Sequence, residues 1–445
     1  MDNFITSKCR SFDNVFYLQQ FLEEHHVESL LDVGCGDFEW QQVLPLDKVA
    51  VTVVDSSPFV IGNVRLKSLP IKTLVRDMVK ENLDDSVDDK FDAVVVRDVI
   101  QYLSPEDGRR LIVNAVRHAK RFLIVNHEPY FVKDNHNHPA NQHHQVNLYI
   151  DPFDFPMPLK SIRDGNMALS IWNVTTLPKY CFPKENPSVL VAILARNKAH
   201  VLPDFLSCLY QQTFPKQQMV LYIRTNDNRD KTEEVIREWL AEHGSEYQHV
   251  EIDATPLVQK QTRPHEWDAS RFLTLGRIRE QSMQKTLEFK CDFYFVIDCD
   301  NFLTPDSLSH LVNLQRPIVA PMLGTIPKRG EFYSNYFCDI SDNGYYKDHP
   351  MYLKYRFREK VGCFEVPVVH CTYLIQAEYI PRLAYVDHSG RYEFVIFSES
   401  ARHSNVKQYI CNEILFGSLL HPPDGISLED EEQLFEDYKA SNTLF

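Results

Sequence analysis

Two aspartates directly follow an apolar run in the second half of the chain. In "CDFYFVIDCDNFLTPDSL", Asp298 and Asp300 flank Cys299 with no turn residue before them. Alternation along a strand points both carboxylates to one side, and a strand of an α/β sheet delivers its carboxyl end to the ligand crevice. Since two like charges so close are costly without a cation between them, the pattern predicts a Mg²⁺ or Mn²⁺ site open to phosphate. The alternative is a solvated turn with an incidental acid pair.

A second candidate site lies near the amino end, where "LLDVGCGDFEW" places Asp32, Gly34 and Gly36 at the expected turn from strand to helix. Glycine lets a backbone approach a ligand closely because no Cβ intervenes. About twenty residues further on, "VAVTVVD" ends in Asp55, a position from which an acid accepts hydrogen bonds from a ribose diol. Phe38 occupies a position after the glycines that departs from the dinucleotide GxGxxG form. The motif therefore favours an adenosine cofactor over a nicotinamide dinucleotide.

These residues resemble the class I S-adenosylmethionine-dependent methyltransferases, over roughly residues 10 to 175. The resemblance implies S-adenosylmethionine as the cofactor. It matches Asp77 in "LVRDM" to the acid that binds the adenine amino group, and it places Asp98 in "FDAVVVRDVIQYL" at the methionine end of the cofactor. Methyl transfer mainly needs alignment, because the sulfonium is already activated. His127 and Glu128, after the fifth expected strand, are the candidates for removing a proton.

Five histidines lie in or near one segment, "NHEPYFVKDNHNHPANQHH". Histidine clusters can form metal sites, but these lack a fixed helical spacing, which favours a polar lid or contacts with the methyl acceptor. They are His127, His136, His138, His143 and His144.

Polar residues also follow two neighbouring strands of the second half. Ala195, Arg196 and Asn197 end the run "SVLVAILARN", and Thr225 and Asn226 end "QMVLYIRTND". Because the carboxyl ends of parallel strands meet at one edge of a sheet, these loops are predicted to build a nucleotide site.

Ordered blocks of the second half resemble the collagen galactosyltransferase and lipopolysaccharide glycosyltransferase family, which has the GT-A fold. They cover nearly all of residues 187–445 and include "VLVAILARNKAHVLPDFL", "HEWDASRF", "FYSNYFCDI", "CFEVPVVHCTYLI" and "KQYICN". The resemblance implies a uridine diphosphate sugar donor, with UDP-galactose the expected sugar. It also implies inversion at the anomeric carbon and a glycan or glycoprotein acceptor. Asp298 and Asp300 become the metal ligands, and Asp300 is counted as catalytic because the metal neutralises the leaving diphosphate.

Further roles follow from the same resemblance. Arg271 in "ASRF" is expected at the donor phosphate or sugar, with a surface salt bridge as the alternative, and Asn335 in "FYSNYF" suits sugar hydroxyls. Glu393 in "SGRYEFVIF" is the expected base. After "YICN" the family pattern has a histidine that completes the metal shell, whereas this chain has Leu415. Either another group fills that place, or the domain is slow or inactive.

The elements that position these residues form two α/β blocks, in which Val/Ile/Leu-rich runs alternate with helical segments. A length of 445 residues exceeds what one core usually supports. We therefore predict an α/β fold in two domains: a Rossmann-like methyltransferase over 1–180 and a GT-A glycosyltransferase over 187–445. Residues 173–187, "NVTTLPKYCFPKENP", are predicted as the linker. The tail is predicted as a capped, acidic and solvated helix from Ser427. The alternative is a helix that packs Leu428, Leu434, Phe435 and Tyr438 against the body of the domain.

Composition narrows the function classes. A formal net charge of −15 without a basic patch argues against binding to nucleic acid or an anionic membrane. No secretory leader or membrane-spanning run is evident, so a cytosolic protein of bacterial or viral origin is expected. Ten cysteines occur as singles, which predicts reduced thiols without a zinc or redox role.

The predicted function is a bifunctional glycan-modifying enzyme that transfers a sugar and a methyl group. One alternative is an active methyltransferase that carries a weak or inactive sugar-binding module. The other is a protein that binds without catalysis and acts as an assembly factor.

Overall fold

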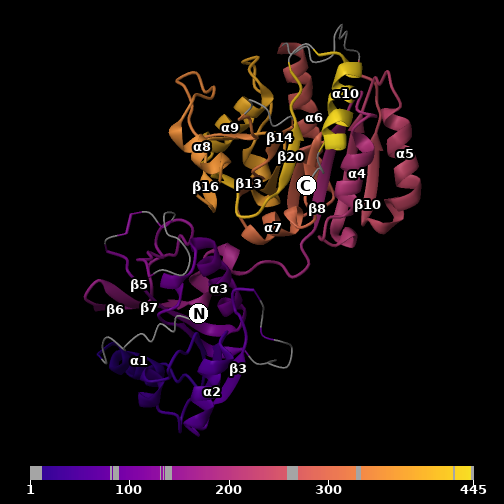
Figure 1. Cartoon of the computed structure of the whole chain (residues 1–445). Coiled ribbons are helices and arrows are strands. Elements are labelled where there is room, and N and C mark those ends of the chain that lie inside the picture. The colour runs from indigo at the N-terminus through magenta and orange to yellow at the C-terminus, as the bar shows by residue number, and fades with distance from the viewer. Residues whose placement is uncertain are drawn as a thin grey trace. The chain divides into compact units, whose positions relative to one another are not determined.

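The computed structural model (Figure 1) shows two compact units, Met1–Pro183 and Lys184–Phe445. Each unit contains its own β-sheet with helices packed on it, so the predicted α/β class with two domains is confirmed. The structure describes residues 13–80, 83, 90–130, 132–133, 135, 143–257, 269–326, 332–423 and 426–441.

The first unit is built on a seven-stranded sheet. Its strands are β1 (Ser29–Val33), β2 (Ala50–Asp55), β3 (Lys72–Val75), β4 (Phe91–Val96), β5 (Ala119–His127), β6 (Lys160–Asp164) and β7 (Met167–Asn173). Its helices are α1 (Asp13–Glu24), α2 (Pro58–Leu66) and α3 (Pro105–Arg117), with 3₁₀ turns η1 (Trp40–Val43) and η2 (Ile100–Tyr102).

The strand order of this sheet is β3-β2-β1-β4-β5-β7-β6, with β1 to β5 parallel and β7 antiparallel to both of its neighbours. Alternate residues of β4 enter two different apolar cores, Ala93 and Val95 on one face and Val94 and Val96 on the other. Burial on both faces explains why these strands read as continuous apolar runs. The order reverses between β1 and β4, which is the point at which such sheets bind ligands.

The predicted linker is wrong over its first half. Leu177 and Cys181 belong to an apolar core of the first unit, and the Arg109 guanidinium lies 3.7 Å from the centroid of the Tyr180 ring. Apolar residues at a spacing of three to four give this segment a buried side, which the three prolines obscured in the sequence. It contains the turns η3 (Val174–Thr176) and η4 (Lys179–Cys181).

The second unit has an eight-stranded sheet of order β10-β9-β8-β11-β18-β13-β19-β16. These strands are β8 (Val189–Ala195), β9 (Met219–Thr225), β10 (His249–Asp253), β11 (Phe293–Asp298), β13 (Ile318–Pro321), β16 (Cys363–Glu365), β18 (Tyr373–Gln376) and β19 (Gln408–Cys411). Strands β8 to β11 are parallel, and β18 runs antiparallel between β11 and β13.

Two small sheets accompany it, of order β12-β20-β14 and β15-β17. Their strands are β12 (Asn301–Leu303), β14 (Gly324–Ile326), β15 (Tyr336–Phe337), β17 (Val368–Val369) and β20 (Gly417–Leu420). The helices of the second unit are α4 (Leu202–Tyr210), α5 (Thr232–His243), α6 (Ala269–Glu288), α7 (Ser307–Leu314), α8 (Pro350–Arg356), α9 (Glu393–His403) and α10 (Leu428–Ser441). The 3₁₀ turns are η5 (Lys216–Gln218), η6 (Gly244–Glu246) and η7 (Ala377–Arg382).

Helix α10 is capped as predicted, because the Ser427 hydroxyl accepts a hydrogen bond from the Asp430 backbone N–H at 3.1 Å. It lies beside α4 (Figure 1). Phe435 stacks on Phe302 with ring centroids 5.1 Å apart, and Glu431 is completely buried. The expectation of a merely solvated helix is therefore wrong. Within the described residues, no helix has both the length and the apolar character needed to cross a bilayer.

Candidate active sites

The glycine turn of the first unit follows β1 and lies beside the carboxyl end of β2. Gly34 has φ +74°, and a Cβ there would lie 2.3 Å from Val99 Cγ2, so only glycine fits. Gly36 has φ +55°, and a Cβ placed there would meet no other atom within 4 Å. Its N–H donates to Asp55 Oδ2 at 3.4 Å. The turn therefore exposes backbone beside Asp55, as a bound nucleoside would require.

Asp55 keeps the capacity to bind a diol. Its Oδ1 accepts from the Ser57 N–H at 2.9 Å, and burial raises the pKa of its carboxyl. Each carboxylate oxygen has two lone pairs, so the two backbone contacts orient the group and leave acceptors unused.

Asp32 supports the turn from within the core, and the structure does not place it at a ligand surface. It is 1% exposed and accepts a short hydrogen bond from Gln41 Nε2, which also donates to Cys35 O at 3.0 Å. Burial raises the pKa of Asp32 to about 7, against the opposing effect of the Gln41 bond. The prediction that Asp32 contacts the cofactor is corrected to a role in holding the turn.

Three further acids follow strands of the same sheet. Asp98, after β4, has φ +56° and donates its N–H to Asn126 Oδ1 at 2.7 Å. Glu128 is buried directly after β5, and its Oε2 has no hydrogen-bond partner among the described residues. Burial raises the pKa of Glu128, His143 opposes this, and Asp98 adds to it. Asp77, after β3, is partly exposed and pairs with Lys80 at 3.0 Å.

His127, predicted as a possible base, is unsuited to that role. It is fully buried, its Nε2 bonds Ser170 Oγ at 3.0 Å, and its Nδ1 accepts from the Leu148 N–H at 3.3 Å. Burial lowers its pKa to about 3. Both nitrogens of a neutral ring are occupied, which leaves Glu128 as the acid–base candidate. Of the other predicted lid histidines, His136 and His138 lie outside the described residues.

In the second unit, three strands end together around the acid pair. Asp298 is opposite Leu194 on β8, and Ala195 is opposite Thr225 on β9. Cys299 is buried in the core, whereas the side chains of Asp298 and Asp300 are 26% and 23% exposed. The two carboxylates thus alternate with a buried residue, as a strand end requires.

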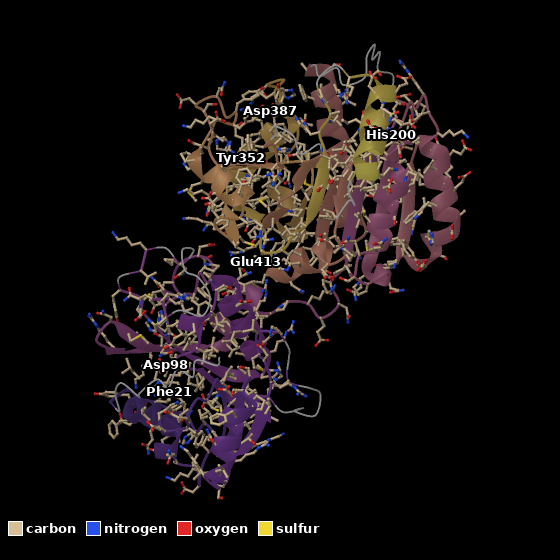
Figure 2. The ribbon with its side chains drawn as sticks, in the orientation of Figure 1. Phe21, Asp98, His200, Tyr352, Asp387 and Glu413 are labelled. Carbon is tan, nitrogen blue, oxygen red and sulfur yellow. The ribbon has the colours of Figure 1, made fainter. Side chains whose placement is uncertain are left out.

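Each of these acids has a cationic partner. Arg279 Nη2 lies 2.8 Å from Asp298 Oδ1, and Lys198 Nζ lies 3.0 Å from Asp300 Oδ2. Lys198 also pairs with the buried Glu431 of α10 at 2.6 Å. Burial and the neighbouring Asp300 raise the pKa of Asp298, and Arg279 opposes the rise. Figure 2 labels His200 beside α10, where its Nε2 lies 3.4 Å from Glu431.

Arg279 links the acid pair to the predicted base. Its Nε lies 3.7 Å from Oε1 of Glu393, the first residue of α9, which is 7% exposed. Burial raises the pKa of Glu393, and Arg279 opposes this, with a smaller opposing effect from the half-buried Arg271. The sequence analysis missed Arg279. Its position on the buried face of α6, together with Phe272 and Gly276, could have indicated that Arg279 is a buried charge.

The two predicted nucleotide loops are tied to each other. Asn197 has φ +53°, its N–H donates to Asn228 Oδ1 at 3.0 Å, and its Oδ1 accepts from the Arg229 N–H at 2.7 Å. Asn228 Nδ2 donates to the hydroxyl of the fully buried Thr225 at 2.7 Å. Asn197 and Thr225 therefore shape the loops.

The neighbouring Asn226 donates through Nδ2 to Asp227 Oδ2 at 2.9 Å. Burial lowers the pKa of Arg196, and Asp227 opposes this. Ala195, Arg196 and Asn226 thus lie at the predicted edge of the sheet.

Asn335 is a correction. It is fully buried, its Nδ2 donates to Pro321 O at 2.8 Å and Thr372 O at 3.2 Å, and its Oδ1 accepts from the Leu323 N–H at 3.1 Å. Every hydrogen-bonding group of the amide bonds to backbone atoms. The Asn335 side chain therefore holds strand ends together and is not directed at a sugar.

The position of Leu415 also differs from expectation. Its side chain is 70% exposed, and its carbonyl accepts from Thr304 Oγ1 at 2.9 Å. The Asp300 carbonyl instead accepts from the Leu420 N–H at 2.9 Å, and the N–H of the next residue, His421, donates to Ile326 O at 2.9 Å. The His421 ring stacks on Tyr333 with centroids 4.1 Å apart.

Sequence comparisons match each of the two units to a family of domains. Residues 186–439 match the family model described as glycosyltransferase family 25, N-terminal domain, and residues 31–122 match a methyltransferase domain. Procollagen galactosyltransferase 2 of Homo sapiens is 37% identical over 265 residues, which are 57% of this chain and 42% of that protein. Inactive glycosyltransferase 25 family member 3 of Mus musculus is 33% identical over 263 residues, 56% of this chain and 43% of that protein.

Among solved structures, S. aureus TarS 1–349 in complex with UDP-GlcNAc aligns with a TM-score of 0.38 at 12% identity. The alignment covers 54% of this chain and 60% of that one. This score is too low to carry an argument about function, so the assignment rests on the sequence matches.

The relatives contradict the expected location and origin of the protein, and the family match shows to which family it belongs. Their sources are animals such as human and fruit fly, and several are named for procollagen, so the expected cytosolic location and bacterial or viral origin are wrong. The chain spans less than half the length of these curated relatives. Because the family model covers more than half of the chain, the chain belongs to glycosyltransferase family 25, and it carries a methyltransferase domain before that region.

Proposed function

We propose that the second unit transfers galactose from UDP-galactose, with inversion, to a hydroxyl group of a glycoprotein acceptor. We further propose that the first unit transfers a methyl group from S-adenosylmethionine to a sugar or related acceptor. The observation that carries the glycosyl transfer is the convergence of Asp298 and Glu393 around Arg279 at the carboxyl end of β11, with Asp300 held beside them by Lys198. The relatives named procollagen galactosyltransferase support the choice of sugar and acceptor.

The acid pair fits a divalent cation. Both carboxylates are partly exposed and adjacent, and their mutual repulsion contributes to the raised pKa of Asp298. Carboxylate oxygens suit Mn²⁺ or Mg²⁺, so Asp298 and Asp300 are the residues that would hold the ion. When bound, the ion would supply charge neutralisation for the leaving diphosphate.

The remaining steps belong to the chain's own residues. Glu393 would accept the proton of the acceptor hydroxyl, and its burial keeps the carboxylate basic enough for that transfer. Arg279 holds Glu393 and Asp298 in one arrangement, since its planar guanidinium contacts both carboxylates in a fixed geometry. Lys198 holds Asp300 in place from the opposite side.

In the first unit, the open glycine turn and the acids at four strand ends fit S-adenosylmethionine. Gly34 and Gly36 would let the backbone approach the cofactor, Asp55 would bind the ribose diol, Asp77 the adenine amino group, and Asp98 the methionine end. Glu128, buried with an unpartnered oxygen, would take a proton from the acceptor.

A second candidate function is a sugar-binding module without turnover. Two observations favour it: a mouse relative is named inactive, and Arg279 and Lys198 already neutralise both acids of the pair. In that case the methyltransferase unit carries the catalytic activity.

The test is turnover of UDP-galactose with Mn²⁺ and a hydroxyl acceptor, followed as UDP release. We expect the Asp298→Asn/Asp300→Asn variant to lose at least about 100-fold in rate, whereas Asp342→Asn, at an exposed position, leaves the rate unchanged. Equal rates in all three proteins would remove the metal assignment. Calorimetric binding of UDP-galactose without any turnover would establish the second candidate.

A further inference from the structure

A second cluster of metal-ligating side chains lies away from the acid pair. His310 of α7, Cys411 at the end of β19, and Glu413 each place one ligand atom within 4.8 Å of the other two. His310 Nε2 lies 2.8 Å from Glu413 Oε2 and 4.0 Å from Cys411 Sγ. Among the described residues, this is the group of three such side chains with that spacing.

The cluster is sheltered, and a second cysteine lies next to it. Cys411 is completely buried, and the side chains of His310 and Glu413 are 17% and 12% exposed. Cys363 is the direct cross-strand partner of Cys411 in the β16–β19 pair, and its thiol hydrogen-bonds Cys411. Figure 2 shows Glu413 by α7, well apart from His200 beside α10.

The side chains of the cluster also interact with one another. Burial lowers the pKa of His310, but its bonds with Cys411 and Glu413 outweigh this and raise it to about 9. Burial raises the pKa of the Cys411 thiol, but the bonds from Cys363 and His310 outweigh this and lower it.

We propose that His310, Cys411 and Glu413, with Cys363 as the fourth ligand, bind one zinc ion. Zinc accepts nitrogen, sulfur and oxygen ligands in a tetrahedral shell, whereas Mg²⁺ and Mn²⁺ prefer oxygen. Ligand distances of that shell place nitrogen and oxygen about 3.4 Å apart, and nitrogen and sulfur about 3.6 Å apart. The observed 2.8 Å and 4.0 Å lie within an ångström of these values, so small side-chain movements would complete the shell.

The ion would stabilise the segment between β19 and β20. The ion would join α7 to β16 and β19. The residues after Glu413 lead to Phe416, whose carbonyl accepts a hydrogen bond from Ser307 Oγ at 3.1 Å. Strand β20 then pairs with β12, directly after Asp300. Zinc binding would release the imidazolium proton and the thiol protons to solvent, because the ligands must be deprotonated. The site is thus structural and separate from the proposed sugar transfer.

The test is the zinc content of the full chain, purified without chelators, loaded with zinc and dialysed against Mn²⁺. We expect one zinc per chain. Cys411→Ser and Glu413→Gln should weaken zinc binding by about tenfold or more, whereas Cys208→Ser, at a buried cysteine of α4, keeps it. Loading with Co²⁺ should give a sulfur-to-cobalt charge-transfer band that Cys411→Ser lacks.

Two further proteins make the outcome decisive. Asp298→Asn/Asp300→Asn should retain its zinc, which separates this site from the proposed catalytic metal. Glu413→Gln changes one polar atom of a partly exposed residue, so it keeps the test valid if Cys411→Ser does not fold. Zinc content that both cluster variants leave unchanged would overturn the proposal. So would a metal-free chain with a Cys363–Cys411 disulfide.

Discussion

At the scale of single residues, Arg279 decides how the proposed glycosyltransferase site is held. It is 5% exposed and contacts one metal-binding candidate, Asp298, and the candidate base, Glu393. Removing one partner of a buried charge pair leaves the other charge uncompensated, which usually destabilises a protein by about 3–5 kcal/mol. Arg279 is therefore a positioning residue whose loss affects both stability and chemistry.

We predict that Arg279→Gln lowers the unfolding free energy of the second unit by about 3–5 kcal/mol and lowers kcat for galactosyl transfer more than it raises KM. Arg279→Lys should recover part of the stability but little of kcat, because an ammonium cannot hold both carboxylates in a fork. Arg277→Gln, on the exposed side of the same helix, is the control. Chemical denaturation and steady-state kinetics measure both effects. A control-like Arg279→Gln would refute this role.

Glu393 gives a prediction about pH. Its pKa is raised, mainly by burial, and a base acts only when deprotonated. The rate of sugar transfer should therefore fall, as pH decreases, at a higher pH than an ordinary glutamate would give. Glu393→Gln should be slow at every pH and show no such limb in its pH–rate profile. A wild-type profile that is flat through mildly acidic pH would contradict this.

Asp32 gives an independent prediction for the first unit. Its folded pKa is about 7, above its ordinary value of 3.8. The folded state therefore binds the proton more tightly than the unfolded state, and stability from this group is lost as pH rises from about 4 to about 7. Asp32→Asn should remove a few kcal/mol of that pH dependence and keep the Gln41 bond. Denaturation curves of the two proteins at several pH values measure this. Parallel pH dependences would contradict it.

At the scale of elements, strands were predictable and partners across elements were not. The apolar runs that form β1, β4, β8 and β11 are buried on both faces. Their continuous apolar composition was therefore enough to predict them as strands. The acids after them follow from strand direction. Asn335 was misread because a sequence does not show that backbone groups use all of its amide. The cluster around Cys411 was not predicted because its candidate ligands come from α7, β16 and β19 and have no short, regular spacing in the sequence.

The tail helix α10 gives a prediction at this scale. Its fully buried Glu431 pairs with Lys198, which in turn holds Asp300. Glu431→Gln leaves Lys198 with only one of its two carboxylate partners. We therefore expect a loss of about 3–5 kcal/mol in the unfolding free energy of the second unit. Glu432→Gln, exposed on the next position, is the control and should change stability by under about 0.5 kcal/mol. Equal stabilities of the two variants in urea denaturation would show that α10 contributes no buried charge pair.

At the scale of the whole molecule, the chain combines two separate sheets, each with a candidate site at the carboxyl ends of its own strands. Residues of the methyltransferase-type site come from β1 to β5, and those of the glycosyltransferase-type site come from β8 to β11 with α6 and α9. A covalent link between two transferases does not by itself couple their chemistry. Coupling would need one ligand to change the other's affinity.

We therefore predict that variants of one site leave ligand binding at the other unchanged. Asp55→Ala should abolish calorimetric binding of S-adenosylmethionine and leave the UDP-galactose dissociation constant within about twofold. Asp298→Asn/Asp300→Asn should do the reverse, because each set of ligands is held by hydrogen bonds and ion pairs within its own unit. Titrating each ligand with the other at saturation is the complementary measurement. A reciprocal shift of tenfold or more would correspond to about 1.4 kcal/mol of coupling and would show that the two units act as one allosteric system.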